Sequence, residues 1–148
     1  MLQMVLGTTD DFVLAILRLV LGIVMFAHGA QKVTGWFGGE GFTATMRIFT
    51  QQMGIPAPLA FLAIAAEFFG GLGLIVGLFG RIAAFGILCN MIVAILMVHA
   101  RFGFFMNWFG KQQGEGFEYH LLAIAIALAI LIKGSGAFSI DRLLTAVL

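Results

Sequence analysis

Long apolar segments recur along this chain, and they constrain its fold more than any other feature of the sequence. A helix needs about 20 mostly apolar residues to cross a lipid bilayer. Four segments come near that requirement, at about residues 12–33, 57–79, 82–99 and 117–132. A chain of 148 residues is too short to bury all of them from water. The sequence therefore predicts an all-α transmembrane four-helix bundle that forms one integral membrane domain over residues 1–148.

The composition agrees with a lipid environment and excludes several classes of function. Hydrophobic residues make up 61% of the chain and charged residues only 10%, against about 25% charged in ordinary globular proteins. Eight basic and seven acidic residues nearly cancel, so no positive field is available to bind nucleic acid. The single cysteine, Cys89, excludes an internal disulfide, and no histidine pair has a metal-binding spacing. We therefore expect no metal site and no nucleic-acid partner. The lipid bilayer is the expected environment of most of the chain.

Two loops repeat the same pair of short motifs in the same order. Trp-Phe-Gly at 36–38 and Gly-Glu-Gly-Phe at 39–42 follow the first apolar segment, and the same strings at 108–110 and 114–117 follow the third. The first and third segments run in the same direction, so both loops are expected on one side of the membrane. This order favours two parallel two-helix repeats, although aromatic and glycine residues are also common in interfacial loops.

Shorter amphipathic stretches outside the four segments predict helices that lie in the membrane interface. The first has helical spacing of apolar residues, at Phe42, Met46, Phe49 and Met53. A second follows Ser139, which can cap a short helix. Basic residues are divided almost evenly between the two sides, and a slight excess near the segment ends favours both termini in the cytoplasm.

Two ionisable residues fall deep inside the apolar segments, where a charge costs at least about 2.5 kcal/mol and marks a candidate functional position. Arg18 lies in the first segment and Glu67 in the second, and Asn90 in the third lies close to the depth of Glu67. At about 1.5 Å per residue, the depths of Arg18 and Glu67 differ by about 7 Å, which an arginine side chain spans. We predict that Arg18, Glu67 and Asn90 form a polar cluster inside the bundle. An equally supported alternative to a functional role is that Arg18 and Glu67 form a structural ion pair that sets the helix register.

A second polar layer is predicted nearer the two loops, with Trp36 and Trp108 as its roof. Its expected ligand-binding residues are His28, Gln31, Lys32, Trp36, Arg101, Trp108, Glu118 and His120. A site that is polar at its mouth and aromatic at its walls suits an amphiphile such as a quinone or a lipid. The two tryptophans are also typical of anchors in the membrane interface.

Several short motifs occur in an order that resembles one known family. They are Arg18-Leu19, His28-Gly29, the Trp-Phe-Gly-Gly loop at 36–39, the Glu-Phe-Phe-Gly-Gly string at 67–71, Glu118-Tyr119 and the Ser-Ile-Asp string at 139–141. The chain resembles the DoxX family of small four-span bacterial membrane proteins, which implies a multi-pass protein of the bacterial plasma (inner) membrane. Some members are described as subunits of a quinone-linked oxidoreductase that passes electrons from sulfur compounds to the quinone pool. The family is also similar in topology to the vitamin K epoxide reductase bundle, whose paired cysteines are absent from this sequence.

Three functions are compatible with these patterns and with the resemblance. The leading hypothesis is a membrane subunit of a quinone-linked redox system that offers a quinone or lipid-like ligand a site and has no covalently bound redox centre of its own. Its expected partners are a redox protein and a second copy of the chain. The alternatives are a small proton-coupled transporter or channel that uses Glu67, and a membrane scaffold without a ligand. The patterns leave open whether the protein is an enzyme.

Overall fold

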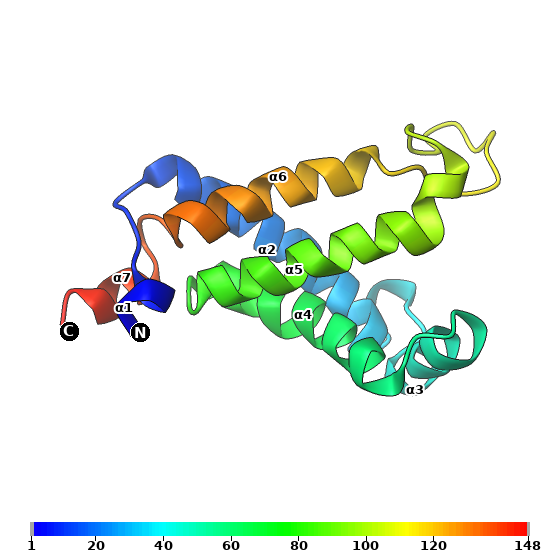
Figure 1. The fold of residues 1–148 in the computed structure, drawn as a ribbon, viewed down its shortest axis with the longest axis horizontal. Helices are drawn as coiled ribbons and strands as arrows, with labels where there is room; N and C mark the ends of the chain where they lie inside the picture. The colour runs from blue at the N-terminus through cyan, green and yellow to red at the C-terminus, as the bar shows by residue number, and fades with distance from the viewer. Residues whose placement is uncertain (1, 148) are drawn as a thin grey trace.

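The computed structural model describes residues 2–147, and all regular structure in this part of the chain is helical. Its four long helices are α2 (Phe12–Val33), α4 (Ala57–Val76), α5 (Gly80–Ala94) and α6 (Glu118–Lys133). They extend along the long axis of the molecule (Figure 1). Short helices α1 (Leu2–Leu6), α3 (Phe42–Arg47) and α7 (Ile140–Thr145) lie at the two ends of the bundle. The predicted all-α bundle is therefore confirmed.

Within residues 2–147, three helical stretches are long and apolar enough to cross a membrane, namely Phe12–Val33, Ala57–Val76 and Gly80–Phe102. The third stretch continues α5 through a π-helical turn, Ile95–His99, and a 3-10 turn, Ala100–Phe102. The fourth predicted span, α6, has 16 residues. At about 1.5 Å per residue it is about 24 Å long. The hydrocarbon core of a typical bilayer is about 30 Å thick, so α6 is shorter than the core.

The first predicted span agrees with α2 at both ends, whereas the second ends earlier than the sequence suggests. Gly77 adopts a left-handed conformation with φ of +70° and ends α4 at Val76. Its N–H bonds back to the carbonyls of Gly73 and Leu74, which is a common way for glycine to end a helix. The apolar residues that follow Gly77 therefore belong to the turn between α4 and α5.

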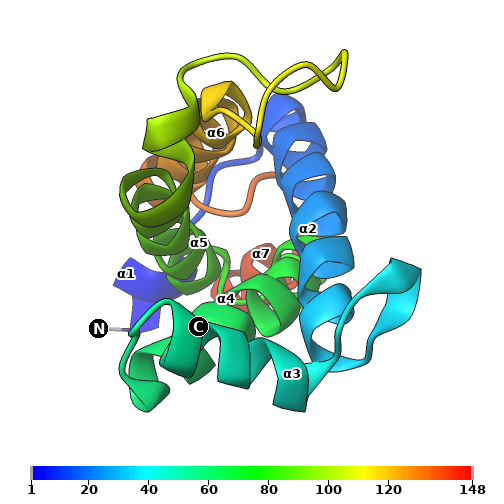
Figure 2. The same ribbon diagram turned by 90° about the vertical axis from the view of Figure 1, so that its right-hand side faces the viewer.

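The four long helices pack in the order α2, α4, α5 and α6 around a common apolar core. Figure 2, a view along the long axis, shows this arrangement. The core is formed by buried side chains from all four helices, which include Leu21, Met25, Leu74, Ile87, Met91 and Ile130. Contact is extensive between successive helices, but α6 touches α2 over a much shorter stretch. The bundle is therefore least closed between α2 and α6.

Glycines bring the backbones of α2 and α4 into direct contact. A Cβ atom added at Gly29 would lie 2.5 Å from the backbone of Phe68, and one added at Gly71 would lie 2.5 Å from the backbone nitrogen of Phe26. Small residues allow this kind of close helix approach inside membranes. The approach sets the position of every side chain that α2 directs toward α4.

The C-terminal segment caps the start of α5. The Asp141 carboxylate accepts hydrogen bonds from the backbone N–H of Phe79 (2.7 Å) and of Gly80 (2.9 Å), and from the Ser135 hydroxyl (2.6 Å). Ser139 begins α7 as predicted, and its hydroxyl accepts from the N–H of Arg142 (3.2 Å). A carboxylate at a helix N-terminus satisfies free N–H groups and opposes the positive end of the helix dipole. Besides being a short amphipathic helix, α7 therefore joins the tail to the bundle.

Both loops with the repeated motifs lie at the same end of the molecule, opposite the two termini (Figure 1). The first motif pair forms a 3-10 turn, Trp36–Gly38, and leads into α3, which continues as a π-helical turn, Ile48–Gln52. The second pair leads into α6. The predicted placement of both loops on one side is confirmed, and a helix begins at or just after the phenylalanine of each Gly-Glu-Gly-Phe string.

Replacing Gly71 by alanine is expected to lower the free energy of unfolding by about 1–3 kcal/mol, because the added methyl group forces α2 and α4 apart. Thermal unfolding of the protein in detergent measures the change. The neighbouring Gly70→Ala variant is the control, since its Cβ would come no closer than 3.6 Å to any atom of another helix, which is ordinary van der Waals contact. We expect Gly70→Ala to keep the stability of the original chain. Equal losses in the two variants would contradict the close approach of α2 and α4.

Candidate functional site

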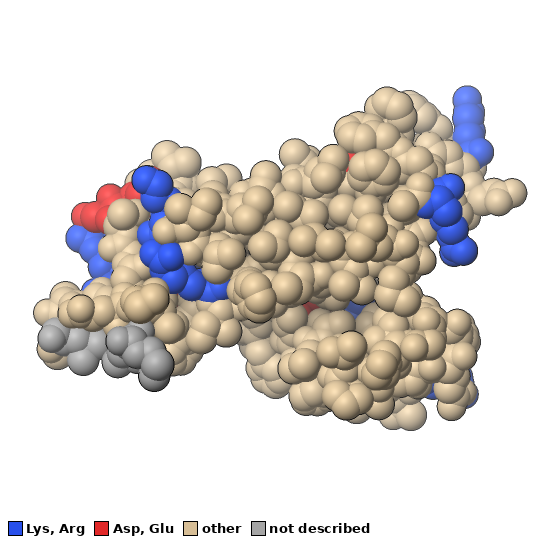
Figure 3. Space-filling model, viewed as in Figure 1, with Lys and Arg blue, Asp and Glu red and all other residues tan. Residues whose placement is uncertain are grey.

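A buried polar cluster joins three helices near the loop end of the bundle. Lys32, in the last turn of α2, pairs with the carboxylate of Glu67 on α4. The amide of Asn90 on α5 donates to the other oxygen of this carboxylate at 2.8 Å. The side chain of Glu67 is 9% exposed and that of Lys32 is 23% exposed. Figure 3 shows a hollow between α4 and α5 toward this end, with acidic and basic atoms at its bottom.

Arg18 lies in a different environment from the one predicted. Its guanidinium donates to the backbone carbonyls of Ser135 (2.8 Å), Ile75 (2.8 Å) and Phe138 (3.2 Å), and also to that of Leu74. The residue is 1% exposed. Its partners are the end of α4 and the segment before α7. Arg18 therefore lies at the end of the bundle that holds both chain termini (Figure 1), which we call the terminal end.

The predicted grouping of Arg18 with Glu67 and Asn90 is therefore corrected, and Lys32 takes the place assigned to Arg18. The reason is that side chains of a helix point back toward its N-terminus. The Arg18 side chain extends from α2 toward the terminal end, away from Glu67. The Lys32 side chain extends from the end of α2 into the bundle, toward Glu67. Depth counted along the helix axis could not distinguish these two directions.

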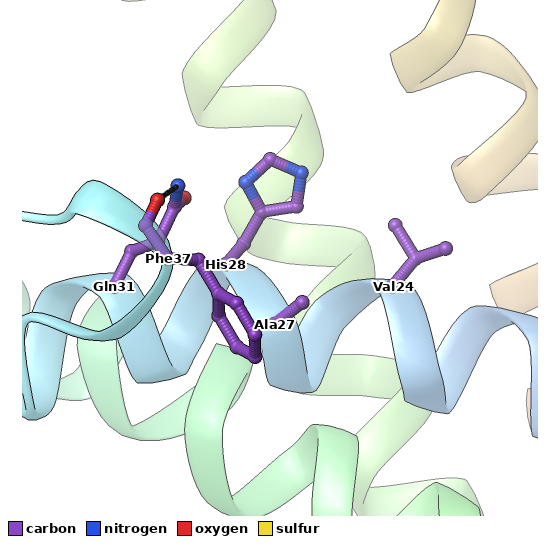
Figure 4. Close-up of a pocket in the computed structure, with 5 residues that line it drawn as sticks. All are labelled: Val24, Ala27, His28, Gln31 and Phe37. Carbon is purple, nitrogen blue, oxygen red and sulfur yellow. Dashed lines mark hydrogen bonds between the residues drawn. The ribbon is translucent and has the colours of Figure 1, made fainter.

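A pocket of about 230 Å³ lies beside this cluster (Figure 4). Its lining residues are Val24, Ala27, His28, Gln31 and Phe37. The first four occupy one face of α2, because they fall at positions i, i+3, i+4 and i+7. Phe37 comes from the first loop and has a φ of +55°, and its carbonyl accepts a hydrogen bond from the Gln31 amide at 3.3 Å. The loop therefore closes one side of a pocket whose other wall is a helix.

Four ring side chains form a row from this pocket to the second loop. The ring centroids are 6.1 Å apart between His28 and Tyr119, 5.3 Å between Tyr119 and His120, and 4.1 Å between His120 and His99. His120 is 6% exposed. Its Nδ1 atom and the Tyr119 hydroxyl are buried and have no hydrogen-bond partner within residues 2–147. At the far end of the row, Nδ1 of His99 donates to the carbonyl of Glu115 at 2.8 Å.

The structure divides the predicted ligand-binding residues among three places. His28 and Gln31 line the pocket. Lys32 belongs to the buried ion pair, and His120 belongs to the row of rings. Tyr119 was expected in the polar layer near the loops, whereas the ring of Phe37 was not predicted as a site residue. Nothing in the sequence indicated that Phe37 would fold onto α2.

The remaining predicted residues lie at the loop-end surface, outside the pocket. The Trp108 indole donates to the Glu118 carboxylate at 3.0 Å, and the guanidinium carbon of Arg101 lies 4.6 Å from the centre of the Phe102 ring. Trp36 is exposed beside Phe37, and its ring meets that of Phe37 edge to face. The expected tryptophan roof is therefore corrected, because the left-handed turn at Phe37 directs the phenylalanine, and not Trp36, toward the pocket. Within the described part of the chain, no group of three or more His, Cys, Asp or Glu residues is placed to hold a metal ion.

These features define a small all-helical membrane protein with a buried ion pair and a pocket at one end. The DoxX family profile matches residues 13–100, and the chain belongs to the DoxX family. "Putative oxidoreductase CatD" of Bacillus subtilis (strain 168) is 31% identical over 126 residues, which cover 85% of this chain and 82% of that protein. "Inner membrane protein YqjF" of Escherichia coli (strain K12) is 27% identical over 135 residues, which cover 91% and 94%. No solved structure matches the chain.

The Lys32–Glu67 pair leads to a prediction about stability. It distinguishes the interaction between the two charges from the packing contacts that each side chain makes separately. Glu67→Leu leaves the Lys32 charge without its partner, and we expect a loss of about 2 kcal/mol in unfolding free energy. Removing one partner of a fully buried pair costs about 3–5 kcal/mol. We expect a smaller loss here because Lys32 is partly exposed. The double variant Lys32→Met/Glu67→Leu is expected to lose less than Glu67→Leu alone. Thermal unfolding of the variants in detergent tests this expectation, and losses that simply add in the double variant would contradict it.

Proposed function

We propose that this protein is the membrane subunit of a redox system in the bacterial plasma membrane, and that it binds a quinone-like amphiphile in the pocket at His28. The observation that supports this most is the composition of the pocket. Its wall has the apolar side chains of Val24 and Ala27 at one end and the polar groups of His28 and Gln31 at the other, with the Phe37 ring beside Ala27. The relative that carries the name oxidoreductase supports a redox association.

The geometry suits a flat ring with polar atoms at its edge and an apolar tail. The His28 imidazole and the Gln31 amide can donate hydrogen bonds to carbonyl oxygens, and the Phe37 ring offers a surface for stacking. His28 lies about 8 Å from the end of α2, counted at about 1.5 Å per residue, which is a depth typical of an amphiphile headgroup. Below it, exposed apolar side chains such as Val20 continue along α2 and offer a surface for the tail.

In this proposal the chain binds and orients the ligand, and a redox protein exchanges the electrons. The Lys32–Glu67 pair lies next to the polar end of the pocket and supplies a fixed charge distribution there. The loop end would face the outside, and both termini would lie in the cytoplasm. A second copy of the chain is a further candidate partner.

Binding of decylubiquinone to the protein in lipid nanodiscs tests the proposal, with calorimetry as the measurement. We expect His28→Ala and Phe37→Ala each to weaken binding about tenfold. A tenfold change corresponds to about 1.4 kcal/mol in binding free energy, which is typical for the loss of one hydrogen bond or ring contact. Trp36→Ala is the matched control, because Trp36 neighbours Phe37 but does not line the pocket. Absence of binding, or an equal loss in Trp36→Ala, would contradict the proposed site.

A proton-coupled transporter is the second candidate function, and the position of Glu67 favours it. This carboxylate is buried in a span and is held by residues from two other helices. In proteoliposomes containing a pH-sensitive dye, we expect Glu67→Gln to abolish proton flux and Asp10→Asn, a change at an exposed carboxylate, to preserve it. Flux that persists in Glu67→Gln would exclude this function.

A further inference from the structure

Two neighbouring residues at the start of α6 connect the pocket with the second loop. Successive residues of a helix point about 100° apart, so Tyr119 faces His28 on α2 while His120 faces His99. His99 ends the π-helical turn Ile95–His99. Such turns insert an extra residue into a helix and occur frequently at functional sites. Here the turn lies where α5 presents an imidazole to α6.

Two atoms in the middle of this row that can carry protons have no hydrogen-bond partner in the described part of the chain. The Tyr119 hydroxyl and Nδ1 of His120 are buried without a partner within residues 2–147. A buried polar group without a hydrogen bond costs about 1–3 kcal/mol, and such groups are rare. The binding site proposed above does not use either atom. Their burial in a continuous row therefore calls for a role of its own.

The end groups of the row suit proton exchange with two different surroundings. At the loop end, His99 is partly exposed and its Nδ1 donates to the Glu115 carbonyl. In the neutral ring this bond leaves Nε2 as a proton acceptor. At the other end, His28 lines the pocket.

We propose that His99, His120 and Tyr119 conduct protons between water at the loop end and a quinone-like headgroup bound at His28. This inference rests on the proposed function, since it requires a ligand in the pocket. In each transfer one N–H or O–H bond breaks and one forms on the neighbouring group, with one water between the two groups, since no hydrogen bond joins them directly within residues 2–147. No electron moves along the row. A proton that enters at His99 leaves on the headgroup oxygen, and the reverse direction uses the same groups.

At the pocket end of the row, the nearby charged groups compensate each other. Lys32 on α2 and Glu67 on α4 lie near the pocket end and form an ion pair, and Asn90 on α5 and Gln31 on α2 add neutral amides. A compensated pair lowers the cost of a transient positive charge on an imidazole compared with an isolated cation. The pocket end of the row therefore lies beside an ion pair that is already balanced.

A pH-jump experiment on the full chain in nanodiscs tests the proton path. The probe is lapachol, a prenylated hydroxynaphthoquinone whose visible absorbance reports the protonation of its hydroxyl group. We expect the protonation rate of the bound probe to fall at least about tenfold in His120→Phe and in Tyr119→Phe, with affinity for the probe unchanged. Both variants keep a ring of similar size. The control is Phe109→Leu, a change at an exposed ring of the second loop outside the row, which should leave the rate unchanged.

The outcomes separate this inference from the proposed function. Binding of lapachol with the same protonation rate in both ring variants and in the original chain would overturn the proton path and keep the binding site. Failure of the original chain to bind the probe would overturn the proposed site and the path together. Tyr119→Phe removes a single oxygen atom, so it provides the measurement even where His120→Phe alters folding.

Discussion

A charge inside a bilayer must find its partners within the protein, since lipid offers none. In this chain two sets of such charges connect the helices at opposite ends of the bundle. Arg18 donates to carbonyls at the end of α4 and in the segment before α7. Lys32 and Glu67 neutralise each other, and Asn90 adds a bond from α5. Moving α2 along α4 would separate both sets of partners, so these contacts and the glycine contacts between the backbones specify one register.

The two ends of the bundle have different properties as a result. At the terminal end, Arg18 and Asp141 satisfy carbonyls and N–H groups that helix termini leave free. These are backbone contacts made by fully buried side chains, and they suit a structural role. At the loop end, polar side chains contact one another, a pocket opens beside them, and two buried polar atoms have no partner in the described part of the chain. The ligand site and the proton path are therefore proposed at the loop end.

Polar residues deep in the apolar segments could be identified from the sequence, but their partners could not. Arg18, Glu67 and Asn90 stand out because charged and amide groups are rare in lipid. The choice between Arg18 and Lys32 as partner of Glu67 depends on side-chain direction along α2, which depth along the axis does not include. Similarly, the loop motif indicated aromatic rings near the site, but a single left-handed residue determines that Phe37 and not Trp36 reaches the pocket.

The sequence by itself determined the lipid environment, the helical class, the common side of the two loops and the family. These properties follow from local quantities, namely the length and hydropathy of segments and the order of short motifs. Only the tertiary structure decided that Lys32 neutralises Glu67, that Asp141 caps α5, and that His28, Tyr119, His120 and His99 form a row. The physical reason is that each of these contacts joins residues on different helices, so it depends on the rotation and register at which the helices pack.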